Sequence, residues 1–350
     1  MSKFFSPVNM SLLVIITGIG LSFTSFSETS NFLFISFIIM LIVLFIHELG
    51  HVIGGKLAGY QFVHMTVGPI TIEKVPTIKI SANTNWVTFG GVASCIPIEI
   101  DLSDMVNQHK KFVAGGPIAT LLAFIISLVM WFITQHDIAM LFTILHLAIF
   151  AATVSPSKGT FRSDGSVLLT LHKGGKEAET YLAGLILLKE LMSPKKPQDW
   201  EEQLIEEAQH TKVSIDTVQT AFLLFYYHLV TGNYEKASRS IASFKNLPVT
   251  TKTKLNLQFI THIRQIDYFL SFEPNVQVIK ELHLQMSNFE PISYKRSEAM
   301  VAYLEGDKKR AYQLLEEVIE KCTKGSKQYG FFEAERELTQ VVKQQLAKRA

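Results

Sequence analysis

Residues 31–56 read NFLFISFIIMLIVLFIHELGHVIGGK, an almost unbroken apolar stretch that contains the pentapeptide His47-Glu48-Leu49-Gly50-His51. Two histidines four residues apart project from the same face of a helix, so both imidazoles can bind one tetrahedral zinc ion. Glu48 lies beside them, where a carboxylate can take a proton from a zinc-bound water. The stretch therefore predicts a metal site within a membrane-spanning helix.

Two simpler explanations of the pentapeptide are chance and a helix whose ionisable residues pair only with one another. Three ionisable side chains at the depth of a bilayer are costly, and such residues usually face an interior cavity and carry function. The apolar setting of the pentapeptide favours a metal site over both explanations.

Charged residues are distributed unevenly over the 350 residues. The first half is rich in Phe, Ile and Leu, whereas residues from about 173 onward hold most of the Lys, Glu and Gln. The net charge of only +2 gives no large patch that points to nucleic acid. Cys95 and Cys322 lie far apart without a CxxC spacing, which predicts free thiols rather than a disulfide framework. We expect a membrane domain over residues 1–172 and an all-α cytoplasmic domain over residues 173–350.

Four stretches are long and apolar enough to span a bilayer, over residues 10–26, 32–55, 113–134 and 138–154. The first could instead be a cleaved signal peptide, since Lys3 precedes its apolar core and small residues follow it. We expect an uncleaved anchor, because nothing after it resembles a secreted domain. The sequence thus predicts an α-helical polytopic membrane protein.

The basic residues of the connecting segments predict the orientation of these spans. The links at residues 27–31 and 135–137 contain no Lys or Arg, whereas eight basic residues fall on the other side: Lys3, Lys56, Lys74, Lys79, Lys110, Lys111, Lys158 and Arg162. Both termini are therefore expected in the cytoplasm, and the pentapeptide towards the cytoplasmic end of its span. The high Ile, Phe and Lys content without an organelle signal indicates a bacterial plasma membrane.

The segment between the second and third spans, residues 61–100, has a different pattern. Phe62–Val67 and Ile70–Ile72 alternate β-branched and aromatic residues around a Gly-Pro turn, and Pro76–Ile80 and Trp86–Phe89 continue the alternation. Alternation with a period of two, interrupted by turn residues, predicts short strands. We expect a small hairpin or sheet at the membrane surface.

The C-terminal half contains two similar segments, Tyr227–Ala237 and Tyr303–Ala311. Each places a helix before a Gly and an Ala five residues after it. This pattern resembles the turn of a tetratricopeptide repeat, a helical hairpin that stacks into a concave binding surface. An unspecialised domain of packed amphipathic helices explains the same pattern nearly as well.

A catalytic zinc site keeps three protein ligands and one open position. Asp164 begins a short apolar helix after the last span and is a candidate third ligand. An Asp at this position could also cap the helix by accepting hydrogen bonds from its first N–H groups, and taken alone capping is the simpler explanation. His146 in the last span is a substitute ligand, although a core histidine bonded to a backbone carbonyl explains it more simply.

The order of motifs along residues 30–172 resembles the site-2 protease family of intramembrane zinc metalloproteases, peptidase family M50. The HExxH pentapeptide is followed by Gly90-Gly91-Val92, by Ala114-Gly115-Gly116-Pro117 at the start of a span, and by Asp164-Gly165. The resemblance implies a single zinc ion bound by His47, His51 and Asp164, with Glu48 as the catalytic base.

Two departures from the family pattern concern substrate contacts rather than metal ligands. The family commonly reads Gly-Pro-x-x-Asn at the start of the span after the strands, whereas Thr120 stands at the last position here. The family often has Asn-x-x-Pro before the Asp-Gly pair, whereas this chain has residues 155–163, including Arg162. We expect Gly90, Gly91 and Thr120 to contact substrate, with an extended peptide added to the edge of a strand over residues 86–92.

Three classes of function fit this pattern to different degrees. An intramembrane zinc endopeptidase would cleave a transmembrane or short hydrophobic peptide near the cytoplasmic face, in regulated proteolysis or peptide maturation, and the helical domain would bind a protein partner or substrate. A membrane-anchored adaptor would keep the metal site as a relic. A transporter is disfavoured, because only four spans and no inverted repeat of broken helices are predicted.

Overall fold

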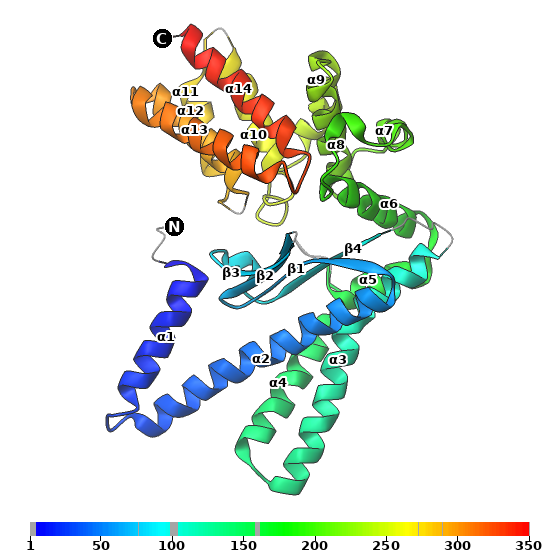
Figure 1. Cartoon of the computed structure of the whole chain (residues 1–350), viewed down its shortest axis with the longest axis vertical. Coiled ribbons are helices and arrows are strands. Elements are labelled where there is room, and N and C mark those ends of the chain that lie inside the picture. Colours follow the sequence, from blue (N-terminus) through cyan, green and yellow to red (C-terminus); the bar gives the residue numbers. More distant parts are fainter. Residues whose placement is uncertain are drawn as a thin grey trace. The chain divides into compact units, whose positions relative to one another are not determined.

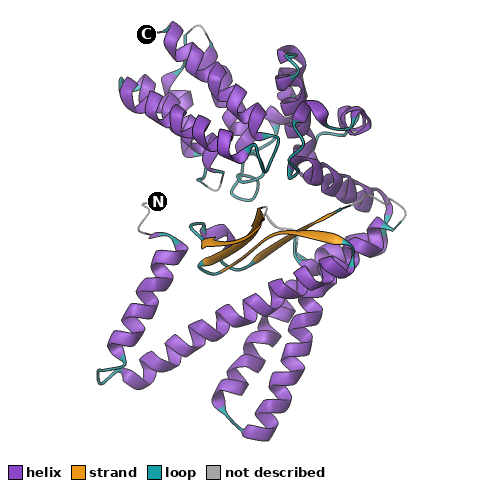
Figure 2. Cartoon of the chain, viewed as in Figure 1, coloured by secondary structure: helices purple, strands orange, loops and turns teal. Residues whose placement is uncertain are grey.

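The computed structural model describes residues 5–75, 77–98, 104–157, 162–271, 273–288 and 290–349. Lys3, Pro76 and Lys158, on which some expectations above rest, lie outside the described residues. The chain folds into two compact units, Met1–Ala178 and Glu179–Ala350. Helices dominate both units (Figure 1), and Figure 2 shows that the strands belong to the first.

Three helices of the first unit are long and apolar enough to cross a membrane: α2 (Ser27–Leu57), α3 (Met105–Thr134) and α4 (Asp137–Val154). A helix of the length of α2 extends about 46 Å, which exceeds a hydrocarbon core of about 30 Å. Many Leu, Ile and Phe side chains along the three helices are exposed, as is expected of surfaces that contact lipid.

The first predicted span corresponds to α1 (Pro7–Leu21), which has 15 residues. At this length the helix extends only about 22 Å and ends before residue 26. A fourth span over residues 10–26 is therefore not confirmed and stays a prediction.

Helices α2 and α3 pack with their backbones in direct contact through glycines. A Cβ atom on Gly50 would overlap the carbonyl group of Gly115, and one on Gly54 would overlap the carbonyl oxygen of Lys111. Small residues at a helix crossing permit this close approach in membranes. The contact fixes the level of the pentapeptide relative to the first turns of α3.

A four-stranded antiparallel sheet connects α2 to α3 in the chain, with strand order β3-β2-β1-β4. Its strands are β1 (Tyr60–Val67), β2 (Ile70–Val75), β3 (Thr77–Ala82) and β4 (Val92–Pro97). Met65 at the centre of β1 lies opposite Ile72 of β2 and Ala93 of β4. The same methionine packs with Leu44 of α2, which places the sheet beside the pentapeptide helix.

The strand expected over Trp86–Phe89 is wrong. These residues contain a single 3₁₀ turn, η2 (Trp86–Thr88), and β4 begins only at Val92. The side chain of Asn85 accepts a hydrogen bond from the Val87 N–H (3.1 Å), which caps the turn. The apolar alternation of this segment is therefore overridden by the capping asparagine before it.

The last helix of the first unit is α5 (Asp164–Lys173), and α6 (Gly175–Leu191) leads into the second. The second unit continues with helices packed on one apolar core. These are α7 (Glu202–Gln209), α8 (Val218–Val230), α9 (Tyr234–Ala242), α10 (Gln258–Leu270), α11 (Val276–Leu284), α12 (Pro291–Leu304), α13 (Lys308–Gly325) and α14 (Phe332–Lys348), with 3₁₀ turns η3 (Pro197–Asp199), η4 (Ile215–Thr217) and η5 (Phe244–Asn246). Cys95 and Cys322 are free thiols, as predicted, and both are buried.

Two helical hairpins, α8–α9 and α12–α13, occur where the sequence showed similar segments. Gly232 and Gly306 adopt positive φ at the two turns. In each case the next residue caps the following helix with its side chain, and the alanine five residues after the glycine is buried. The turns are thus alike, while a tetratricopeptide-like architecture for the whole unit stays a prediction.

A buried polar network joins four helices of the second unit. The fully buried Arg296 guanidinium of α12 forms an ion pair with Glu335 of α14 and donates to His262 Nε2 of α10 (3.0 Å). The Tyr226 hydroxyl of α8 donates to the other carboxylate oxygen of Glu335. Burial, with the nearby Arg296, holds the pKa of His262 well below its ordinary value, so the ring is neutral and accepts from the guanidinium. An ion pair and hydrogen bonds therefore hold the helices of this unit together in addition to apolar packing.

Candidate metal centre

The two histidines of the pentapeptide face the interior of the first unit on adjacent turns of α2. Their side chains are almost completely buried, at 4% exposure for His47 and 6% for His51. The two Nε2 atoms lie 3.2 Å apart. The helical spacing of four residues therefore brings both ring nitrogens to one point, as the sequence predicted.

Asp164, the first residue of α5, reaches the same point from more than a hundred residues away. Its Oδ2 atom lies 3.3 Å from His47 Nε2 and 3.5 Å from His51 Nε2. The alternative that Asp164 caps α5 is wrong, because the hydroxyl of Ser163 accepts the capping hydrogen bond from Ser166 N–H (3.3 Å). The Asp164 carboxylate does not accept the capping hydrogen bond and lies beside the two histidines.

Gly165 explains why an Asp-Gly pair is needed here. A Cβ atom at this position would overlap the carbonyl group of Val154, the last residue of α4. Any larger residue would push the start of α5 away from α4. The glycine therefore allows Asp164 to approach α2.

The hydrogen bonds of the outer ring nitrogens orient both histidines. His51 Nδ1 lies 3.1 Å from the carbonyl oxygen of Phe112, which can only accept. His47 Nδ1 lies 2.9 Å from the Thr120 hydroxyl, which donates its own proton to the Gly116 carbonyl oxygen (3.0 Å). The carbonyl oxygen makes His51 Nδ1 a donor, and a Thr120 hydroxyl that donates to Gly116 accepts from His47 Nδ1. In this arrangement both Nε2 atoms carry lone pairs towards Asp164. Such partners fix the tautomer of metal-binding histidines.

These atoms fit a metal ion. Two imidazole lone pairs and one carboxylate oxygen converge within 4.8 Å, and three acceptors without a donor between them repel unless a cation is present. The Asp164 Oδ2 atom is buried and, among the described residues, has no hydrogen-bond partner. Ligands about 2.0–2.2 Å from a tetrahedral zinc ion lie roughly 3.3–3.6 Å apart, close to the separations observed.

Gly116 provides room around the ligand atoms. A Cβ atom on Gly116 of α3 would collide with His51 Nε2. The Gly115-Gly116 pair therefore has two separate tasks, since Gly115 permits the contact with α2 and Gly116 leaves space for the metal-facing nitrogen.

Glu48 lies beside the histidines and beneath the turn that precedes β4. Its side chain is buried, and a Cβ atom on Gly91 would overlap its Oε1 atom. Gly91 has a φ of +110°, whereas a Cβ atom on Gly90 would meet nothing within 4 Å. Of the two glycines expected to contact substrate, Gly91 covers the Glu48 carboxylate and Gly90 borders open space.

Thr120, the third residue expected to contact substrate, is fully buried behind His47. Its hydroxyl donates to Gly116 and accepts from the imidazole, as described above. The structure gives Thr120 a place behind a ligand, and a substrate contact for it stays a prediction.

We expect Thr120→Val to weaken zinc binding about 10- to 100-fold, the usual effect of losing such a partner. Valine keeps the shape of threonine and removes the acceptor of the His47 Nδ1 proton. Competition with a chelator measures the affinity. Thr120→Ser should restore it, and Thr134→Val, which removes a hydroxyl bonded to Met130 on the same helix, should not change it. Equal zinc affinity of Thr120→Val and Thr134→Val would contradict this role.

Asn83 also contributes to the site, and it was not among the residues expected there. Its buried side chain donates to the Gly68 carbonyl oxygen (2.7 Å) and accepts from the Thr88 hydroxyl (3.2 Å). The Gly68 N–H in turn donates to the Phe89 carbonyl oxygen (2.9 Å). Asn83 thus connects the β1–β2 turn to the glycine turn that covers the Glu48 carboxylate. An Asn in a turn-rich segment was the available signal.

Three other polar residues of the first unit do not belong to the cluster. His109 of α3 is 2% exposed, and its Nδ1 atom lies 3.3 Å from the Tyr60 hydroxyl. His146 is buried in α4 and does not join the cluster of His47, His51 and Asp164. Arg162 pairs with Glu177 (3.1 Å).

Comparison with known proteins gives one match. A family model described as peptidase family M50 matches residues 35–329, which is most of the chain and extends into both compact units. No curated protein and no solved structure matches the chain.

Proposed function

The chain belongs to peptidase family M50, and from this premise we propose that it is an intramembrane zinc endopeptidase of the site-2 protease type. The observation that carries the proposal is the convergence of Asp164 of α5 with His47 and His51 of α2, beside Glu48. Helix α2 is long and apolar enough to cross a membrane. M50 peptidases depend on zinc, and the three acceptors would hold one ion.

The chemistry assigned to these residues is hydrolysis of a peptide bond. The zinc ion, when bound, polarises the substrate carbonyl and makes water acidic enough to react near neutral pH. Glu48 takes a proton from the attacking water while the water oxygen bonds to the carbonyl carbon of the substrate. The same carboxyl group then passes this proton to the amine nitrogen as the C–N bond breaks. Thr120 and Phe112 hold the histidines in the tautomer that this requires.

The proposed substrate is a transmembrane or short hydrophobic peptide cut near the cytoplasmic face. We infer an apolar substrate because Glu48 is buried and lies in an apolar helix. The distribution of basic residues supports a multi-pass protein with both termini in the cytoplasm. The high Ile, Phe and Lys content supports a bacterial plasma membrane. Residues 1–172 would form the protease domain and residues 173–350 a domain that binds a partner or substrate.

Metal removal tests the proposal. Stripping the purified protein with 1,10-phenanthroline should abolish cleavage of membrane peptides, and added zinc should restore it, because the ion is required to activate water. The substrate pool would be the membrane peptides that accumulate in cells carrying Glu48→Gln. Cleavage that persists after complete metal loss contradicts the proposal, and no cleavage by the zinc-loaded protein favours the adaptor function instead.

We also propose that substrate binds as an added strand along β4. Among the described residues β4 pairs only with β1, so its other edge is open, and this edge leads to Gly91 above Glu48. A helical substrate must unwind before attack, and pairing with a strand edge replaces the hydrogen bonds that it loses.

Single proline substitutions along β4, at Ala93, Ser94, Cys95 and Ile96, test this mode of binding. Backbone N–H groups along β4 point alternately to β1 and to the open edge. Proline at two of the four positions therefore removes a hydrogen bond to β1 and should disturb the sheet, whereas proline at the other two removes only an outward N–H group and should leave the sheet folded. We expect the folded pair to lose about fivefold to tenfold in cleavage, the effect of one missing hydrogen bond. Hydrogen exchange of β1 identifies the folded variants. Full cleavage by those variants contradicts strand addition.

A further inference from the structure

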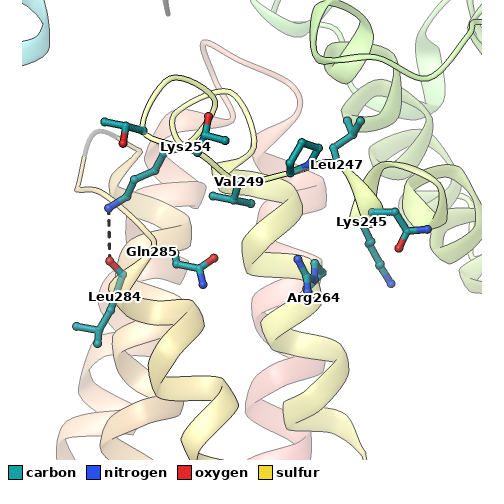
Figure 3. Close-up of a pocket in the computed structure, with 11 residues that line it drawn as sticks. Lys245, Leu247, Val249, Lys254, Arg264, Leu284 and Gln285 are labelled. Carbon is teal, nitrogen blue, oxygen red and sulfur yellow. Dashed lines mark hydrogen bonds between the residues drawn. The ribbon is translucent and has the colours of Figure 1, made fainter.

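The second unit contains a pocket of about 880 Å³ that the proposed chemistry does not use. It lies between η5, the segment after it, α10 and the end of α11 (Figure 3). Its lining residues are Lys245, Asn246, Leu247, Pro248, Val249, Thr250, Thr251, Lys254, Arg264, Leu284 and Gln285.

The charged residues of this lining are all cationic: Lys245, Lys254 and Arg264. Lys245 forms an ion pair with Asp267, and Lys254 donates to the Leu284 carbonyl oxygen at the end of α11 (3.4 Å). Within the described part of the chain, Arg264 has no acidic partner. A guanidinium offers a fork of donors that matches a carboxylate, so Arg264 is the residue best placed to bind one.

The arrangement of the cations indicates the class of ligand. Lys254 lies on one side of Val249, and Arg264 and Lys245 lie on the other (Figure 3). Cations on the two sides of an apolar residue can bind acidic side chains that are spaced along a peptide. The apolar Leu247, Val249 and Leu284 line the same pocket and offer contacts to apolar side chains between the acidic ones.

We propose that this pocket binds an extended peptide segment that carries both acidic and apolar side chains. Arg264 forms a paired hydrogen bond with one carboxylate, and Lys254 attracts a second from the opposite wall. The site is a docking site for a protein segment, apart from the metal centre, and its occupation does not depend on whether the proposed peptidase activity is correct.

Fluorescence anisotropy with the full-length protein in detergent micelles tests the proposal. The probes are a fluorescein-labelled peptide rich in Glu and Leu and a matched peptide in which every Glu is Gln. We expect the acidic peptide to bind at least about tenfold more tightly than its Gln counterpart. Arg264→Gln should weaken it about tenfold, the usual effect of losing a charged hydrogen bond.

Arg310→Gln is the matched control, because this exposed arginine pairs with Glu298 outside the pocket lining and its loss changes the net charge equally. Its affinity for the acidic peptide should equal that of the unsubstituted protein. Lys254→Gln provides a second variant from the opposite wall and should also weaken binding. Equal binding of the two peptides, or equal loss in Arg264→Gln and Arg310→Gln, overturns the proposal. Displacement of the acidic peptide by short-chain phosphatidylglycerol, lost in Arg264→Gln, would assign the pocket to a lipid headgroup and also overturn it.

Discussion

Replacing Glu48 by Gln is expected to lower peptide cleavage about 10²- to 10⁴-fold, the range that general acid–base catalysis contributes. The amide keeps the size of the carboxylate and the contact with Gly91, but it cannot accept a proton from water. Because Glu48 is not one of the three converging ligand groups, the variant should bind zinc as the unsubstituted protein does. Cleavage of membrane peptides is followed by mass spectrometry, and zinc content by elemental analysis.

Two further variants separate the roles of the neighbouring residues. Asp164→Ala should lose zinc and activity together, whereas Glu48→Gln should lose activity alone. Glu28→Gln, in the first turn of the same helix, should change neither. Unchanged cleavage by a folded, zinc-loaded Glu48→Gln protein contradicts the peptidase function, and zinc loss in that variant contradicts the assignment of Glu48 as the base.

Arg296→Met is expected to destabilise the second unit by about 3–5 kcal/mol, the cost of removing one partner from a buried ion pair. Methionine fills part of the volume, but it leaves the Glu335 carboxylate buried beside the Tyr226 hydroxyl without a cation. His262 Nε2 also loses the hydrogen bond that the guanidinium donates to it. Hydrogen exchange of α12 and α14 in the full-length protein, measured against urea concentration, reports the stability of this unit locally.

The double variant Arg296→Met/Glu335→Leu distinguishes charge from packing. It removes both buried charges, so it should recover most of the stability lost in the single variant. Arg310→Met, whose guanidinium pairs with Glu298 at the surface, should leave the unfolding of the unit almost unchanged. A double variant as unstable as Arg296→Met would show that lost packing, rather than an unpaired charge, dominates.

The sequence predicted elements whose pattern is local. The apolar length of α2, α3 and α4 and the alternation in β1 and β2 are visible in the chain itself, and the structure places helices and strands there. The pentapeptide geometry is equally local, because helical spacing alone aligns His47 with His51. These features need no knowledge of distant partners.

Features that depend on competition between neighbours or on distant contacts were harder to predict. Ser163 and Asp164 can both cap α5 by their residue type. The structure shows that the Ser163 hydroxyl accepts the capping hydrogen bond, whereas the Asp164 carboxylate lies beside the histidines. Trp86–Phe89 has strand-forming residues, but Asn85 caps a 3₁₀ turn instead. The role of Asn83 rests on partners in another turn, which no sequence pattern specifies.

The glycine contact between α2 and α3 has a mechanical consequence. Helices with backbones in contact at Gly50, Gly54 and Gly115 cannot slide past one another without a steric clash. A bilayer of different thickness changes the tilt of spanning helices, and this pair must then tilt as one body. His47 and His51 lie on one of these helices and Thr120 lies on the other. The orientation of the histidine rings should therefore not change with the thickness of the membrane.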